Sequence, residues 1–169
     1  MLPKVNFERL PYNWAEIEAE LDFLIPDMYK EFYEKIGSVS IDDFIYIVNP
    51  TKTDHIAGLK EFKEDVTEAY LELETFLDKN LYIQFLGKEP GWLPVGYTTN
   101  GDFIFCDSSK VMVTDEAFEE REIYDKSLYE FIELYLNDDL VFTVLSDGAV
   151  GDIHKVLIGE KTSFYAIEN

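Results

Sequence analysis

Few residues in this 169-residue chain have the chemistry of a catalytic or metal-binding site. The two histidines, His55 and His154, lie far apart, and neither belongs to a His-Xaa-Xaa-Xaa-His or His-Glu-Xaa-Xaa-His pair of the kind that holds zinc. The single cysteine, Cys106, lies in an apolar run, which favours a small buried core residue over an activated nucleophile. We therefore expect no catalytic residue, no metal and no cofactor.

Carboxylates are plentiful, with 35 Asp and Glu, so neighbouring pairs arise by chance. Three such pairs are Asp42-Asp43, Asp138-Asp139, and Asp147 with Asp152. By residue type they would suit a glycosidase or a calcium loop, but their spacing fits no EF-hand. The chain contains no nucleophile elbow, no Walker phosphate-binding loop and no dinucleotide fingerprint. Turn and loop-capping roles explain these acids, and a carboxylate-based hydrolase is only a remote alternative.

The charge balance restricts the partners. Against the 35 acids stand 14 Lys and Arg, which gives a net charge of -21. Nucleic acids and anionic membranes attract cationic proteins, so we expect direct binding to neither. A basic protein would be attracted, and its association accelerated. One cysteine favours a reducing compartment, and no signal-like segment or apolar run of about 18 residues is present, so a cytoplasmic location is expected.

The stretch GWLPVGYTTNGDFIFCD, residues 91–107, predicts the hairpin around which the fold is organised. Its arms are residues 93–97 and 102–106, and its connection contains Asn100-Gly101, a pair that tolerates positive φ. In the second arm, Phe103 and Phe105 face one way while Ile104 and Cys106 face the other. Apolar residues on both faces predict a strand that is covered on both sides, near the middle of a sheet.

The remaining elements follow from periodicity and breakers. Apolar residues at helical spacing predict helices over 13–23, 26–37, 54–77 and 127–137. Short apolar runs predict strands over 44–48, 81–86, 111–114 and, briefly, 123–124. The β-rich runs after residue 140 predict two or three terminal strands that extend the sheet or cover its edge. We expect one α+β domain over residues 1–169, with a mixed or antiparallel sheet flanked by helices.

Three stretches resemble motifs of the SUKH superfamily, which includes the fungal Smi/Knr cell-wall regulators and many bacterial immunity proteins. The sequence PDMYKEF at 26–32, followed by Gly37, is similar to the family's early helix. WLPVG at 92–96, followed by Gly101-Asp102, is similar to its central hairpin, and SLYEFI at 127–132 to its late helix. The resemblance covers residues 21–137 and leaves 140–169 as a β-rich extension. It implies an α+β fold without enzymatic activity and, for bacterial members, neutralisation of a toxin by binding.

The resemblance and the charge together predict an immunity protein that binds a basic toxin domain, for example a nuclease, and blocks it. The alternative is a regulatory or scaffold module of the Smi/Knr kind. The chain would act as a monomer or a homodimer. The predicted partner-binding residues are acids expected to be exposed near the hairpin loop and the following turn, and two aromatic anchors: Glu89, Asp102, Asp107 and Asp115, with Trp92 and Tyr97.

Overall fold

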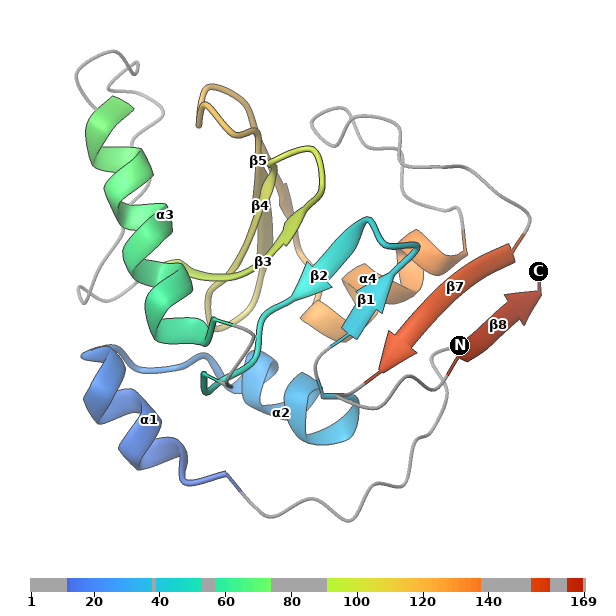
Figure 1. Ribbon diagram of the computed structural model, residues 1–169, viewed down its shortest axis with the longest axis horizontal. Helices are drawn as coiled ribbons and strands as arrows, with labels where there is room; N and C mark the ends of the chain where they lie inside the picture. The colour runs from blue at the N-terminus through green and yellow to red at the C-terminus, as the bar shows by residue number, and fades with distance from the viewer. Residues whose placement is uncertain are drawn as a thin grey trace.

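The computed structural model describes residues 12–37, 39–52, 57–73 and 91–137, together with the backbone of 153–158 and 164–168. Four helices and one eight-stranded sheet make up this part of the chain (Figure 1). The helices are α1 (Trp14–Leu21), α2 (Asp27–Lys35), α3 (Leu59–Leu73) and α4 (Leu128–Leu136). The strands are β1 (Val39–Ile41), β2 (Ile45–Ile47), β3 (Leu93–Thr98), β4 (Phe103–Cys106), β5 (Val111–Thr114), β6 (Arg121–Tyr124), β7 (Ile153–Ile158) and β8 (Phe164–Glu168). The α+β class is confirmed.

The sheet runs in the order β6-β5-β4-β3-β2-β1-β7-β8, and each of these neighbouring pairs is antiparallel. The predicted hairpin is β3 and β4, which lie inside the sheet with strands on both sides. Its register shifts between Pro94 and Gly96, which makes Val95 an extra residue in β3. The terminal strands do extend the sheet, because β7 pairs with β1 and β8 with β7 (Figure 1).

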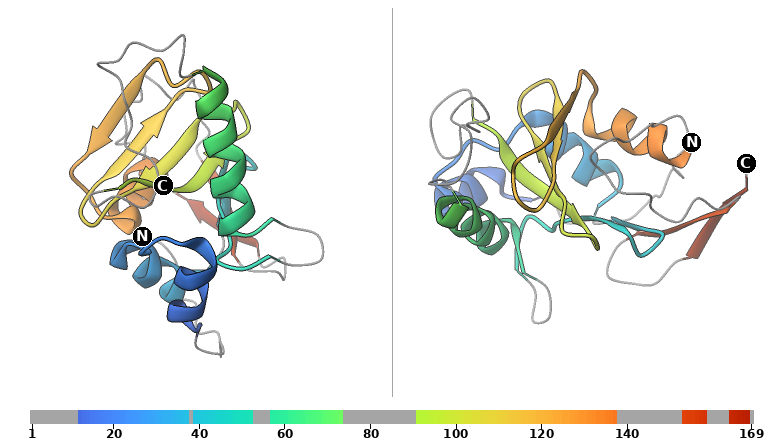
Figure 2. Two further views of the ribbon diagram at one scale, coloured as in Figure 1. Left: turned by 90° about the vertical axis from the view of Figure 1, so that its left-hand side faces the viewer. Right: turned by 90° about the horizontal axis from the view of Figure 1, so that it is seen from above.

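The two faces of the sheet carry separate apolar clusters, as the alternation in β4 predicts. Ile104 and Cys106 belong to the larger cluster, which α1, α2 and α4 share. Phe105 belongs to the smaller cluster, which packs under α3. Seen from above in Figure 2, α3 lies on one side of the strands and α2 and α4 on the other. Burial on both faces is why this strand shows no polar positions.

Local sequence explains where the helices begin and end. Pro26 precedes α2, and Gly37 follows it with φ of 89°, a backbone conformation that glycine adopts without strain. Ser127 and Glu130 form a reciprocal capping box at the start of α4. Helix α3 begins at Leu59. Just before it, the Gly58 N–H donates to Glu61 Oε2 at 3.1 Å, which supplies a partner for a backbone group at the helix start. None of the helices described here has the length and apolar character that a membrane span requires.

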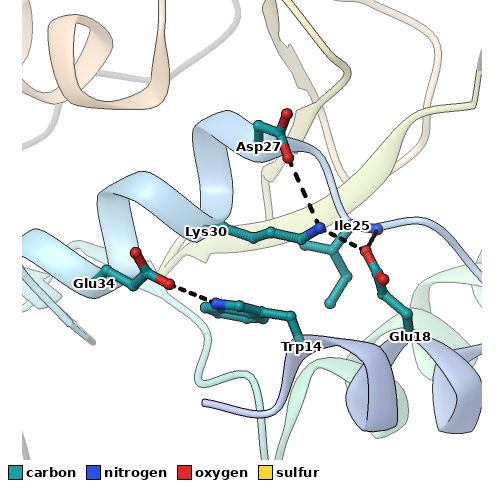
Figure 3. Close-up of polar contacts among 6 residues, drawn as sticks. All are labelled: Trp14, Glu18, Ile25, Asp27, Lys30 and Glu34. Atoms are coloured by element: carbon teal, nitrogen blue, oxygen red, sulfur yellow. Dashed lines mark hydrogen bonds and ion pairs between the residues drawn. The ribbon is translucent and has the colours of Figure 1, made fainter. Parts of the chain in front are cut away.

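Polar contacts hold α1 against α2 (Figure 3). The indole N–H of Trp14 donates to Glu34 Oε1 at 2.6 Å. Lys30 Nζ lies 2.6 Å from Glu18 Oε1, which also accepts the backbone N–H of Ile25 at 3.0 Å. Figure 3 shows Trp14 and Glu18 on one helix reaching across to Glu34 and Lys30 on the other. These contacts fix the helix pair that covers one face of the sheet.

Some predictions differ from the structure or lie outside its described part. Strand β1 was not predicted, because three residues with a serine in the middle are too short a pattern to recognise. Strand β2 is shorter than the predicted 44–48, and the edge strand β6 is longer than predicted. The long helix was predicted to begin at residue 54, but residues 57 and 58 are not helical and α3 begins at Leu59, since Gly58 forms a bridge with Asn49. The predicted strand at 81–86, the last residues of the long helix (74–77) and the run 141–145 lie outside the described residues.

Candidate functional site

Three turns meet at one end of the sheet: β1–β2 (42–44), β3–β4 (99–102) and β5–β6 (115–120). Contacts link them directly, since the Thr99 N–H donates to the Phe44 carbonyl at 3.0 Å and a Cβ added to Gly101 would lie 2.9 Å from Glu116 Oε2. In Figure 1 these turns rise away from α1 and α2. The acids at this end are Asp42, Asp43, Asp102, Asp115, Glu116, Glu119 and Glu120.

We call these seven residues the acidic end. The three turns contain no lysine or arginine, and the first cation after them is Arg121, at the start of β6. Glu116, Glu119 and Glu120 are exposed. The turns at the opposite end are mixed in charge, since β4–β5 contains Lys110 as well as Asp107. The turns at the end formed by the hairpin connections therefore carry negative charge without a neighbouring cation in the same turns.

Asp102 is part of the hairpin's internal structure. The expectation that it is exposed is wrong, because it is only 5% exposed. Its Oδ2 accepts the hydroxyl of Thr98 at 2.6 Å, while its own N–H donates to Thr98 Oγ1 at 3.2 Å. Gly101, with φ of 96°, completes the turn. Gly101 and Asp102 thus close the connection between β3 and β4.

Burial raises the pKa of Asp102 above its ordinary value, and the negative charges of Asp115 and Glu116 raise it further. The hydrogen bond from Thr98 lowers this pKa but does not cancel the rise. The folded protein therefore binds a proton at this carboxyl more tightly than the unfolded chain does, so ionisation of Asp102 lowers the free energy of unfolding as pH rises above about 4.

We expect Asp102→Asn, which keeps an acceptor for Thr98, to gain stability relative to wild type as pH rises from 3 to 6. Urea unfolding of both proteins across this range measures the difference. A difference for Asp102→Asn that is constant with pH would contradict the prediction.

The other two predicted acids that the structure describes also stabilise turns. Asp107 Oδ1 accepts the backbone N–H groups of Ser109 and Lys110, each at 2.7 Å. Asp115 Oδ1 accepts the N–H of Glu120 at 3.0 Å. Both carboxylates remain partly exposed. Asp115 lies at the acidic end together with Asp102, whereas Asp107 lies at the opposite end, so the structure separates residues that were predicted to form one surface.

The two predicted aromatic anchors differ in their setting. Trp92 is partly buried against the α3 cluster, which is a packing role. Tyr97 is 38% exposed and stacks on Tyr46, with ring centroids 5.1 Å apart and planes at 11°. Sequence reasoning missed Tyr46, although its place between Ile45 and Ile47 puts it on the opposite face from two core residues. Glu89 lies outside the described residues.

Catalytic chemistry has little support in the described residues. Cys106 is fully buried, and burial raises the pKa of its thiol, so it stays protonated at neutral pH. Within the part of the chain that the structure describes, no group of three or more His, Cys, Asp or Glu could hold a metal ion. His55 and the side chain of His154 lie outside that part.

A shallow groove of about 480 Å³ runs along α3. It includes the carboxylates of Glu64, Glu68 and Glu72. All three residues are exposed, so the groove presents their carboxylates to solvent on one face of α3.

Comparison with known proteins gives a match to one family model. No curated protein and no solved structure matches the chain. The model of the SMI1/KNR4 family (SUKH-1) matches residues 11–140, which include all four helices and the strands from β1 to β6. The hairpin with its buried Asp102, the capped α4 and the early α2 lie within this match, and the strands β7 and β8 lie beyond it. The chain belongs to the SMI1/KNR4 family (SUKH-1), which includes toxin immunity proteins.

Proposed function

We propose that this chain is a non-enzymatic, cytoplasmic immunity protein that binds a basic toxin domain through the acidic end and thereby blocks it. The observation that carries the proposal is the gathering of seven carboxylates in three adjoining turns that contain no lysine or arginine. Membership of a family that includes toxin immunity proteins supports the toxin as partner.

Inhibition follows from charge and shape. A toxin that cleaves nucleic acid needs a basic surface to bind phosphates. Carboxylates at the acidic end would occupy that surface, and their field would accelerate the encounter. The exposed ring of Tyr97 lies beside the same turns and would supply apolar contact, which charge alone does not.

Rigid turns favour this role. The β3–β4 turn is held by the two hydrogen bonds between Thr98 and Asp102, and the β5–β6 turn by Asp115. Side chains on such turns lose less conformational freedom on binding than side chains on a mobile loop. Asp115, whose carboxylate accepts the N–H of Glu120, thus stabilises the turn that carries the exposed acids Glu116, Glu119 and Glu120.

Co-expression tests the proposal. The C-terminal domain of the protein encoded next to this chain is produced in cells with and without the chain. We expect the chain to restore growth and to co-purify with the toxin domain in a 1:1 complex. A toxin domain that remains lethal in the presence of the folded chain, with no complex recovered, would contradict the proposal.

A further inference from the structure

The stacked rings of Tyr46 and Tyr97, here called the tyrosine pair, form a partly exposed feature on the face of the sheet against which α3 packs. The two residues are register partners on β2 and β3. Phe62 of α3 contacts Tyr97 with ring centroids 5.7 Å apart, so both tyrosines lie on the α3 face. Burial, and to a smaller extent Tyr46, raises the pKa of Tyr97, so its side chain is a neutral phenol at physiological pH.

On one side, the tyrosine pair is followed by further aromatic rings; on the other side, its neighbour across the sheet is a small residue. Phe62 also contacts Phe103, so rings continue from Tyr97 toward β4. On the other side, the register partner of Tyr46 on β1 is Ser40. A serine side chain is too small to cover a phenol ring. The pair keeps accessible surface, since Tyr97 is 38% exposed and Tyr46 is partly exposed.

The position of Tyr46 is fixed next to negative charge. Its hydroxyl donates to the backbone carbonyl of Asp43 at 3.1 Å, which holds the ring over the β1–β2 turn. Asp43 is exposed, and its φ of 53° shows a left-handed turn conformation that aspartate tolerates well. The tyrosine pair thus borders the acidic end directly.

We infer that the tyrosine pair is a docking site for an arginine side chain of the protein partner. A guanidinium is planar, weakly hydrated and stacks on aromatic rings, whereas a lysine ammonium is a compact, strongly hydrated charge. The adjoining carboxylates favour a cation over an apolar side chain. Nucleobases also stack on aromatic rings, but the acids would repel the phosphates that accompany them.

This inference rests on the proposed function for its partner, but it has a test of its own. Hexa-arginine and hexa-lysine peptides carry the same charge, but a guanidinium also binds carboxylates in a bidentate manner, so only the part of an arginine preference that depends on Tyr46 reports stacking. Calorimetry at low salt should give a dissociation constant for hexa-arginine that is about threefold lower than that for hexa-lysine. Tyr46→Leu should reduce this preference. Tyr46→Phe keeps the ring, loses only the bond to Asp43, and should retain it.

The wild-type protein provides a readout that needs no variant. In NMR titrations, hexa-arginine should shift the ring protons of Tyr46 and Tyr97 more than hexa-lysine does. Equal affinities for the two peptides, or a preference of the same size in Tyr46→Leu as in the wild type, would overturn the inference while leaving the proposed function to its own test. An arginine preference in a chain that gives no protection from the toxin would overturn the proposed function alone.

Discussion

Replacing Glu116, Glu119 and Glu120 by lysine is expected to slow association with the toxin domain by at least about tenfold at low salt. These three exposed side chains carry most of the accessible charge of the β5–β6 turn. Reversing them removes attraction and adds repulsion at the same place, so the rate of encounter falls. Stopped-flow association measured at several salt concentrations tests this, and the difference from wild type should shrink as salt screens the charges.

The matched control reverses three exposed acids elsewhere, Glu20 on α1 with Asp65 and Glu68 on α3. Both triple variants change the net charge equally, so a protein that acts only through its total charge would be slowed equally by either. We expect the control to retain most of the wild-type rate. Equal slowing in the two variants would remove the acidic end from the interface.

Gly96→Ala is expected to lower the free energy of unfolding by about 3 kcal/mol. A Cβ at this position would lie 2.5 Å from the backbone oxygen of Tyr46 and 2.9 Å from Ile47 Cδ1. The first of these atoms is backbone, so strands β2 and β3 must separate locally to make room. For a chain of this length, the loss corresponds to a melting temperature about 6–12 °C below that of the wild type.

Thr99→Ala is the matched control, because Thr99 is exposed in the turn of the same hairpin. Its backbone bond to Phe44 is unaffected by the side chain, so stability should change by less than about 0.5 kcal/mol. Thermal unfolding followed by circular dichroism compares the two variants. If Gly96→Ala has the same melting temperature as Thr99→Ala, strands β2 and β3 do not approach each other as closely as these distances indicate.

The hairpin and the helices could be predicted because local chemistry determines them. Asn100-Gly101 specifies the turn between β3 and β4, and the alternation of Phe105 with Cys106 specifies a strand with two covered faces. Ser127 specifies the start of α4 through its capping box. Each of these signals acts over a few residues, so it can be read without knowing the rest of the fold.

The candidate site could be predicted only in part. The anionic character and the hairpin were both evident in the sequence, and Tyr97, which was predicted as an aromatic anchor, is partly exposed. Asp102 and Asp107 were placed on one surface because they flank the same strand. Because that strand spans the sheet, they lie at opposite ends of it, and Asp102 is buried by its bond to Thr98.

Net charge, domain class and family resemblance were thus contained in the order of the residues, since they depend on composition and on short-range pattern. Which acids meet was decided by the antiparallel register, which carries the turns 42–44, 99–102 and 115–120 to the same end of the sheet. Register also placed Tyr46 beside Tyr97, although fifty positions separate them along the chain. Strand pairing between distant segments depends on the packing of the whole core, and no local pattern encodes it.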